Sequence, residues 1–370
     1  MDTSEAITSS KRRTKEAVET VLPFVSIVVP GYNEAGIVKR SLQEICNYME
    51  TLENQYRWEL IFVDDGSTDG TGEIVDAFAK ARKNVHILHH MTNFRLGQAL
   101  RSAFNYSHGD YIVTMDVDLS YSPDHIEKLL TKIRETKARI VIASPYMNGG
   151  KTSDIPWLRR TLSKWANRYL SLTAQGNLST LTGMVRVYDA RFLRSLSLKS
   201  METEINEEII YKAQLLNARI VEIPAHLDWS YGKKAGEGRS SSIKMFRKIV
   251  SCIFSGFIFK PFMFFVLPGV FLMLVSFYPL FWAFIHTMSH YQRLLSSPAL
   301  GRLDYVFADA VAAAFIQSPH SFLVGGFTLM LALQLISLGI LALQNKRYFE
   351  EIFHLGTSIY KYNRENGKVS

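Results

Sequence analysis

Residues 111–120 read YIVTMDVDLS, an apolar run that ends in two aspartates two positions apart. A second run of the same form, WELIFVDDGS at residues 58–67, ends in Asp64 and Asp65. Strands this apolar on both faces need helices on both faces, which indicates an α/β fold with a mainly parallel sheet. In such sheets the ligand crevice lies beyond the carboxyl ends of the strands, where both acidic loops fall. We therefore expect a binding site at that edge.

The segments around these two runs alternate between strand and helix. Apolar β-branched runs predict the strands, and helical spacing of apolar residues predicts the helices. The predicted strands are 24–29, 58–63, 85–88, 111–115, 140–143, 181–188 and 219–223; the predicted helices are 35–52, a segment after Ser67, 96–106, 123–137 and 155–174.

Two long uncharged runs follow the α/β region, at 261–285 and 321–343. At about 1.5 Å per residue, a helix of either length could cross the roughly 30 Å hydrocarbon core. Lys and Arg flank the outer ends of both runs, whereas the connecting residues 286–320 carry only Arg293 and Arg302. This asymmetry predicts that both termini are cytoplasmic.

A basic segment precedes the first of these runs. Residues 240–260 mix Lys and Arg with Ile, Met and Phe, which predicts an amphipathic helix at the membrane interface. The net charge of +8 fits a protein on anionic lipid. We predict no nucleic-acid partner, because the sequence contains no nucleic-acid-binding module.

Asp116 and Asp118 have a spacing that lets two carboxylates share one cation. Two positions apart on an extended backbone, both side chains point to one side, where they can bind Mg²⁺ or Mn²⁺. A cation held against a diphosphate neutralises the charge that grows on a leaving group. The alternative is a polar turn with two solvated acids; the position at a strand end favours the metal site.

Three motifs lie at the predicted strand ends: PGYNE at 30–34, DDGS at 64–67 and DVDLSYSP at 116–123. In this order and spacing, the chain resembles the family 2 glycosyltransferases, which have the GT-A fold. It is most similar to the dolichol-phosphate mannose synthase and polyprenyl-phosphate glycosyltransferase group. The resemblance covers residues 24–240, and paired terminal spans also occur in that group.

The resemblance implies a nucleotide-sugar donor, a polyprenyl or dolichyl phosphate acceptor, and a Mg²⁺ or Mn²⁺ ion. Asp116 and Asp118 would be catalytic and, with Ser120, would hold the metal. TGMVR at 182–186 is similar to the family's strand near the acceptor. The implied substrate contacts are Pro30, Tyr32, Glu34, Val63, Asp65, Val117, Arg160, Lys233 and Arg239.

The expected organisation follows from the resemblance and the apolar runs together. It comprises a flexible tail at 1–22, a GT-A catalytic domain at 23–239, an interfacial helix at 240–260, membrane spans at 261–285 and 321–343, an extracytoplasmic loop at 286–320 and a cytoplasmic segment at 344–370.

The chain departs from the family pattern where phosphate would bind. Pro145 replaces a phosphate-binding arginine, and Arg95 stands where the pattern Asn-x-Gly-x-Gly-x-Ala has its first glycine. Phosphate contacts are therefore expected to be redistributed among Arg95, Arg160 and Arg239. The helix that follows Arg95 could favour negative charge at its amino end.

Two further groups of polar residues have competing interpretations. One group could supply a general base for a sugar hydroxyl, or could form the solvated face of a helix. The other group, three histidines, does not have the alternating spacing of a metal site, so a position at the edge of a strand is favoured. The first group is Glu204, Glu207 and Glu208, and the second is His86, His89 and His90.

A lipid monophosphate acceptor needs little deprotonation at neutral pH, because it is already largely dianionic. The expected function is inverting transfer of a hexose from a GDP- or UDP-sugar to a polyprenyl or dolichyl phosphate at the cytoplasmic face. The alternatives are a polysaccharide synthase, whose Gln-x-x-Arg-Trp motif is not found, and a non-catalytic membrane scaffold. A homo-oligomer is left open.

Overall fold

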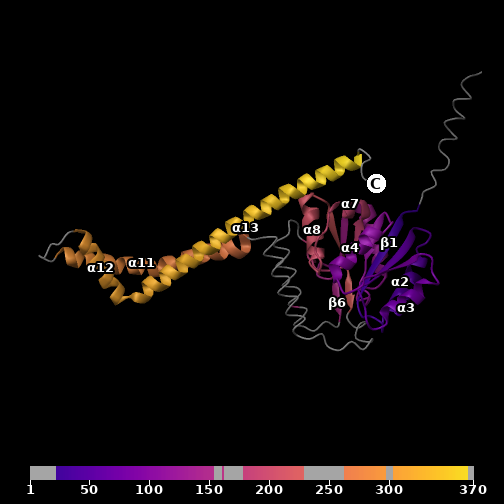
Figure 1. Cartoon of the computed structure of the whole chain (residues 1–370), viewed down its shortest axis with the longest axis horizontal. Helices are drawn as coiled ribbons and strands as arrows, with labels where there is room; N and C mark the ends of the chain where they lie inside the picture. The colour runs from indigo at the N-terminus through magenta and orange to yellow at the C-terminus, as the bar shows by residue number, and fades with distance from the viewer. Residues whose placement is uncertain (1–21, 154–160, 162–177, 229–261, 297–302, 366–370) are drawn as a thin grey trace, which may run out of the picture. The chain divides into compact units, whose positions relative to one another are not determined.

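The computed structural model describes residues 22–153, 161, 178–228, 262–296 and 303–365. The chain forms two compact units, Met1–Ile249 and Val250–Ser370. The first contains the α/β domain and the second the apolar helices (Figure 1). The predicted helix at 155–174 and interfacial helix at 240–260 lie outside the described residues, apart from Thr161.

The first unit is built on a seven-stranded sheet in the order β3-β2-β1-β4-β7-β5-β8. All neighbouring pairs are parallel except those of β7, which runs antiparallel to both β4 and β5. The predicted fold, an α/β domain with a mainly parallel sheet, is therefore confirmed. The strands are β1 (Phe24–Gly31), β2 (Arg57–Asp64), β3 (Val85–His89), β4 (Tyr111–Thr114), β5 (Ile140–Ser144), β7 (Arg186–Asp189) and β8 (Ile220–Pro224).

Helices cover both faces of this sheet, as the apolar strands require. Alternate residues of β1 show the division, because Ile27 and Val29 belong to one core cluster and Val28 to the other. Burying each such side chain contributes about 1.5–3 kcal/mol. The first cluster lies under α2 (Val38–Glu50), α3 (Thr71–Ala79) and α5 (Asp124–Thr136); the second lies under α4 (Leu96–Tyr106), α7 (Ala190–Ser195) and α8 (Ile205–Leu215).

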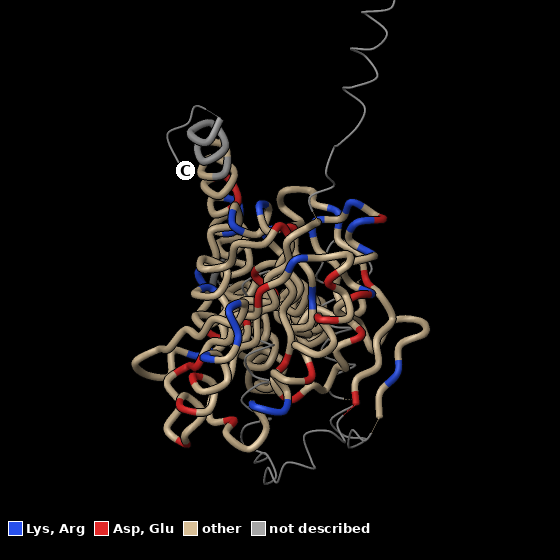
Figure 2. Tube along the Cα trace, turned by 90° about the vertical axis from the view of Figure 1, so that its right-hand side faces the viewer, with Lys and Arg blue, Asp and Glu red and all other residues tan. Residues whose placement is uncertain are grey.

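A small second sheet lies outside the main one. It pairs β6 (Lys151–Ser153) in parallel with β9 (His226–Asp228). The predicted strand 181–188 is shorter in the structure, because β7 begins at Arg186; Arg186–Tyr188 pairs with both β4 and β5, and Asp189 with β4 alone. Figure 2 marks the charged positions along the Cα trace, and a few of these side chains, including Arg186 and Glu207, are buried in the domain.

The second unit consists of long helices: η1 (Phe262–Val266), α11 (Leu267–Leu295), α12 (Leu303–Gln317) and α13 (Pro319–Glu365). Two stretches, Phe262–Leu295 and Pro319–Gly356, are long and apolar enough to cross a membrane. Most of their side chains are exposed within the chain, which suits contact with lipid. Glycines let α11 and α13 approach closely; a Cβ at Gly269 would lie 2.7 Å from Ile336 Cγ1.

Candidate active site

The acidic loop after β4 carries two half-buried aspartates, each followed by a buried apolar residue. Asp116 and Asp118 are half-buried, whereas Val117 and Leu119 between and after them are buried. The loop is a turn, in which Leu119 N donates to Asp116 O at 3.3 Å and Leu119 adopts a positive φ of 48°. This turn, and not the extended backbone expected from the sequence, leaves both carboxylates accessible.

The protein holds this loop from several sides. The Ser120 N–H donates to Asp118 Oδ1 at 2.9 Å, and the Ser120 carbonyl accepts from Asp228 N at 2.8 Å. Tyr121 is buried beside the loop, and burial followed by the charge of Asp116 raises its pKa above the ordinary value. The phenol therefore stays neutral and adds no charge to a pair of acids.

These residues fit a divalent cation that a substrate helps to bind. Among the described residues, no group of three His, Cys, Asp or Glu side chains is placed to hold a metal. Mg²⁺ commonly takes one or two protein carboxylates and fills its remaining positions with substrate phosphates and water. Asp116 and Asp118 would supply the carboxylates, and Ser120 orients Asp118 through its main chain.

The loop after β1 is cross-linked to the loop after β2. The Asn33 and Glu34 N–H groups donate to Ser67 Oγ at 2.9 Å and Thr71 Oγ1 at 2.8 Å. Tyr32 projects from this loop with 44% of its surface exposed, so its ring is available to a ligand. Pro30 and Val63 are buried, and Val63 belongs to the core under α4. Val63 has no exposed surface, so it lies beneath the loop and is not open to a ligand.

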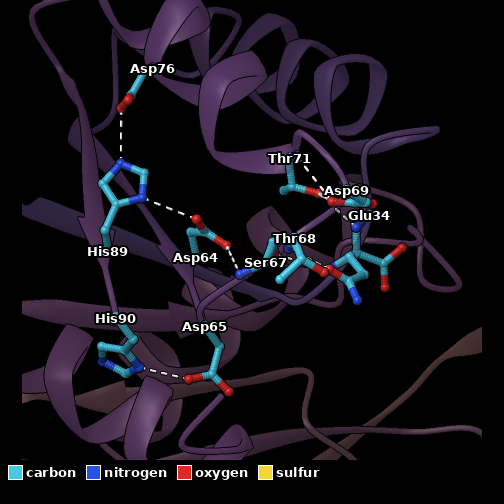
Figure 3. Close-up of polar contacts among 11 residues, drawn as sticks. Glu34, Asp64, Asp65, Ser67, Thr68, Asp69, Thr71, Asp76, His89 and His90 are labelled. Carbon is cyan, nitrogen blue, oxygen red and sulfur yellow. Dashed lines mark hydrogen bonds and ion pairs between the residues drawn. The ribbon is translucent and has the colours of Figure 1, made fainter. Parts of the chain in front are cut away.

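Asp65 is buried, and its carboxylate accepts several hydrogen bonds from the segment that follows β3. Its Oδ1 accepts from His90 Nδ1 at 2.7 Å (Figure 3) and from Phe94 N at 3.0 Å, and its Oδ2 accepts from Arg95 N at 2.7 Å. The Asp65 side chain is 6% exposed. Much of the hydrogen-bonding capacity of this carboxylate therefore holds the protein itself together.

The neighbouring residue Asp64 is held in the same way, by His89. His89 contacts Asp64 Oδ2 through Nδ1 and Asp76 Oδ1 through Nε2, each at 3.0 Å (Figure 3). Burial lowers the pKa of His89, but hydrogen bonds to Asp76 and Asp64 outweigh it and raise the pKa above the ordinary value. Sequence spacing did not reveal these pairs. The contact between Asp64 and His89 follows from the strand register, which places these two residues opposite each other on neighbouring parallel strands.

The amino end of α4 does not offer the open anion site expected from the sequence. Gly97 N and Gln98 N both donate to Met201 O, at 2.9 and 3.3 Å. The Arg95 N–H is bound to Asp65. These N–H groups already have acceptors within the protein, so the amino end of α4 does not present them to an anion.

The acidic run before and within α8 is largely buried. Glu208 Oε1 accepts from Lys212 Nζ at 2.6 Å, and Glu208 also accepts from the Lys199 and Ser200 N–H groups. Glu207 Oε2 has no hydrogen-bond partner among the described residues, and burial raises the pKa of Glu207 to about 7. The interpretation of Glu207 and Glu208 as a solvated face is therefore wrong.

Arg186 lies beside Glu207 and is fully buried. Its guanidinium donates to three carbonyls: Nε to Gly183 O at 2.7 Å, Nη1 to Asn206 O at 2.9 Å, and Nη2 to Leu181 O at 2.5 Å. This arginine therefore fastens the TGMVR segment to α8. No sequence pattern distinguished it from an exposed strand residue.

Other predicted contacts are placed less directly. Pro145 is buried, and Gly150 packs on its main chain, where a Cβ would lie 2.6 Å from the Pro145 carbonyl. The predicted substrate contacts Arg160, Lys233 and Arg239 lie outside the described residues.

Comparison with known proteins places this geometry in a family. The family model Glycosyl transferase family 2 matches residues 26–197, which include most of β1, the acidic loops and β7. An undecaprenyl-phosphate mannosyltransferase of Micrococcus luteus is 31% identical over 206 residues, covering 54% of this chain and 82% of that protein. The chain belongs to glycosyl transferase family 2. This assignment confirms the resemblance drawn from the strand-end motifs.

Other members and structures resemble this family 2 chain. The polyprenol monophosphomannose synthase of Mycolicibacterium smegmatis is 29% identical over 205 residues, covering 54% of this chain and 75% of that protein. Glucosyl-3-phosphoglycerate synthase of Mycobacterium tuberculosis, solved with Mn²⁺, UDP-glucose and phosphoglyceric acid, has a TM-score of 0.47 at 16% identity over 63% of this chain and 79% of that one. A Pyrobaculum calidifontis mannosyltransferase, solved with GDP-Man and Mn²⁺, has a TM-score of 0.41 at 15% identity over 96% and 93%.

Proposed function

We propose that this protein is an inverting, metal-dependent glycosyltransferase that moves a hexose from a GDP- or UDP-sugar to a polyprenyl or dolichyl phosphate at the cytoplasmic membrane face. One observation carries the proposal. Asp116 and Asp118 stand half-exposed at the carboxyl end of β4, in a chain that also has two candidate membrane spans. The names of the two similar enzymes, both polyprenyl-phosphate mannosyltransferases, support the lipid acceptor.

The roles of the residues follow from the charges involved. Asp116 and Asp118 would hold Mg²⁺ or Mn²⁺, and the cation would neutralise the diphosphate that leaves the sugar. Tyr32 offers an exposed aromatic face for a nucleotide base. The β1 and β2 loops are held together by hydrogen bonds, so little ordering is needed when a donor binds.

The acceptor phosphate can itself be the nucleophile. Its second pKa is near 6, so the dianion predominates at neutral pH and no strong base is required. The protein's task is then to hold the lipid phosphate in line with the anomeric carbon. Candidate spans in the same chain support presentation of that phosphate at headgroup level.

The donor can be tested without the acceptor. Sugar nucleotides are screened for thermal stabilisation of the full protein in detergent, with and without Mn²⁺. One GDP- or UDP-sugar is expected to raise the melting temperature only with Mn²⁺, by an amount that corresponds to about 2.7 kcal/mol at a hundredfold excess over Kd. If no donor stabilises the protein with metal, the non-catalytic scaffold replaces this proposal.

A second candidate function has one observation in its favour. Glu207 has a pKa of about 7, which is close to the value that suits a general base at neutral pH. That property would serve transfer to a sugar hydroxyl, as in a membrane polysaccharide synthase. Burial of Glu207 in α8 argues against direct contact with an acceptor, and the two candidate spans within the described residues are too few to enclose a polymer channel. Formation of a water-soluble polymer from the donor would favour this candidate.

A further inference from the structure

Arg95 has a backbone conformation that is almost reserved for glycine. Its φ is 73° and its ψ is 169°. Residues with a Cβ avoid this region, and those that occupy it are usually held there by their surroundings at functional sites. The conformation explains why the family pattern has glycine at this position. The contacts of the arginine side chain are therefore of interest.

The backbone of Arg95 is held by the acidic loop after β2. Its N–H donates to Asp65 Oδ2 at 2.7 Å and to Asn93 Oδ1 at 3.0 Å. Asp65 is in turn fixed by His90, which also contacts Ser102 Oγ of α4 at 2.9 Å. Arg95 is therefore anchored on the side of the site where the donor nucleotide is expected.

The side chain of Arg95 contacts a different segment from its backbone. Its guanidinium forms an ion pair with Glu202, and both groups are about half exposed. Residues 199–202, the tether segment, lie against the first turns of α4. Gly97 has no room for a Cβ, which would lie 2.5 Å from Met201 C, and Arg101 Nη1 donates to Lys199 O at 3.3 Å.

The tether segment continues directly to the buried residues of α8. Glu208 accepts hydrogen bonds from the main chain of Lys199 and Ser200. Two residues before Glu208, the Asn206 carbonyl binds Arg186, which also binds the Gly183 carbonyl. A continuous series of contacts thus joins Asp65 to the TGMVR segment, which the resemblance places near the acceptor.

We propose that Arg95 is a positioning residue for the acceptor, which acts by tying the tether segment to the donor-side loop through Glu202. The inference rests on the proposed function and deepens it. The glycine that the resemblance puts at this position has no side chain to form the ion pair, which therefore depends on the arginine. Because Asp65 and His90 anchor the donor side independently, loss of the tie changes use of the lipid phosphate more than binding of the nucleotide.

The test compares variants of the full-length protein in detergent, with the donor that stabilises it and a detergent-soluble polyprenyl phosphate. Arg95→Gly and Glu202→Gln are each expected to raise the KM for polyprenyl phosphate about fivefold, the upper range for an exposed ion pair. The Kd of the donor stays within twofold of wild type. The double variant Arg95→Gly/Glu202→Gln is expected to be no worse than either single variant, because both remove one interaction.

Two further measurements separate positioning from a loss of folding. Arg95→Gly relieves the backbone conformation, so its melting temperature is expected to equal or exceed that of wild type. Exchanging the charges, Arg95→Glu with Glu202→Arg, is expected to recover part of the lost acceptor affinity. Arg139→Gln is the matched control, since it breaks the ion pair with Asp189 of β7 and its arginine side chain is as exposed as that of Arg95.

The outcomes are distinct. Wild-type acceptor KM in Arg95→Gly, additive effects in the double variant, or an equal loss in Arg139→Gln would each overturn the inference while leaving the proposed function intact. If wild type itself transfers no sugar to polyprenyl phosphate, the proposed function fails and the inference fails with it.

Discussion

His90 donates a hydrogen bond of 2.7 Å from Nδ1 to Oδ1 of Asp65, and both side chains are largely buried. The same carboxylate accepts from the N–H groups of Phe94 and Arg95. With Nδ1 as donor, Nε2 is the acceptor for the Ser102 hydroxyl, 2.9 Å away. One imidazole thus connects the end of β2, the entry to α4 and the body of α4.

His90→Ala is predicted to destabilise this part of the protein by about 1–3 kcal/mol, because it leaves a buried carboxylate short of a donor. Chemical denaturation followed by circular dichroism measures the loss. Ser102→Ala removes only the outer hydrogen bond and is expected to cost less. A stability for His90→Ala within about 0.5 kcal/mol of wild type would show that the hydrogen-bonded group around Asp65 does not depend on it.

Asp118→Ala is predicted to abolish sugar transfer while leaving the fold intact. The carboxylate is half-buried at a loop and outside both core clusters, so its removal costs little packing. Melting temperature and transfer rate are measured together with saturating Mn²⁺. Asp124→Ala, which removes an exposed acid paired with Lys128, is the control and should retain activity. Activity in Asp118→Ala would exclude it as a metal ligand.

The stability of the α/β domain is predicted to fall as pH rises from about 4.5 to about 7, owing to Glu207. Within this window the unfolded chain has lost the Glu207 proton and the folded protein keeps it. Protons bound in excess by the folded state make stability decline with pH. The shift corresponds to a loss on the order of 3 kcal/mol.

Glu207→Gln removes this titration. We expect its melting temperature to exceed that of wild type at pH 8 and to approach it at pH 4.5. Melting curves across this range provide the measurement. A constant difference between the two proteins at every pH would mean that Glu207 does not titrate in this window.

The proposed orientation predicts which part of the chain a protease can reach. In sealed inside-out vesicles, residues 1–240 face the added protease and are expected to be digested, whereas right-side-out vesicles protect them. The positive residues flanking the two apolar runs are the physical reason. An epitope tag at the amino terminus is followed by immunoblot in both preparations. Digestion only in the right-side-out vesicles would mean that the orientation is the opposite of the one proposed.

Much of the sheet could be predicted from the sequence because its strands are apolar on both faces. The helix predicted at 96–106 matches α4, since five buried residues repeat on one side. The predicted strand at 181–188 was too long. Burial of an apolar side chain does not require strand pairing, and Leu181 and Met184 are buried in a loop.

The site was less predictable because its geometry depends on long-range pairing. Asp65 was expected to border the nucleotide, but its bonds to His90 and Arg95 follow from the β2–β3 register and the loop after β3. The burial of Glu207 depends on how α8 packs against Arg186. From the sequence alone, two adjacent glutamates in a helix are expected to face solvent, because the packing of Arg186 against that helix is not visible there.

The most direct test of the central claim is transfer of radiolabel from the sugar nucleotide that stabilises the protein to polyprenyl phosphate. We predict that the label enters an organic-extractable lipid product with Mn²⁺ or Mg²⁺ and that excess EDTA stops its formation. Label that stays in the aqueous phase with every donor that binds, or a lipid product formed equally well in EDTA, would contradict the account.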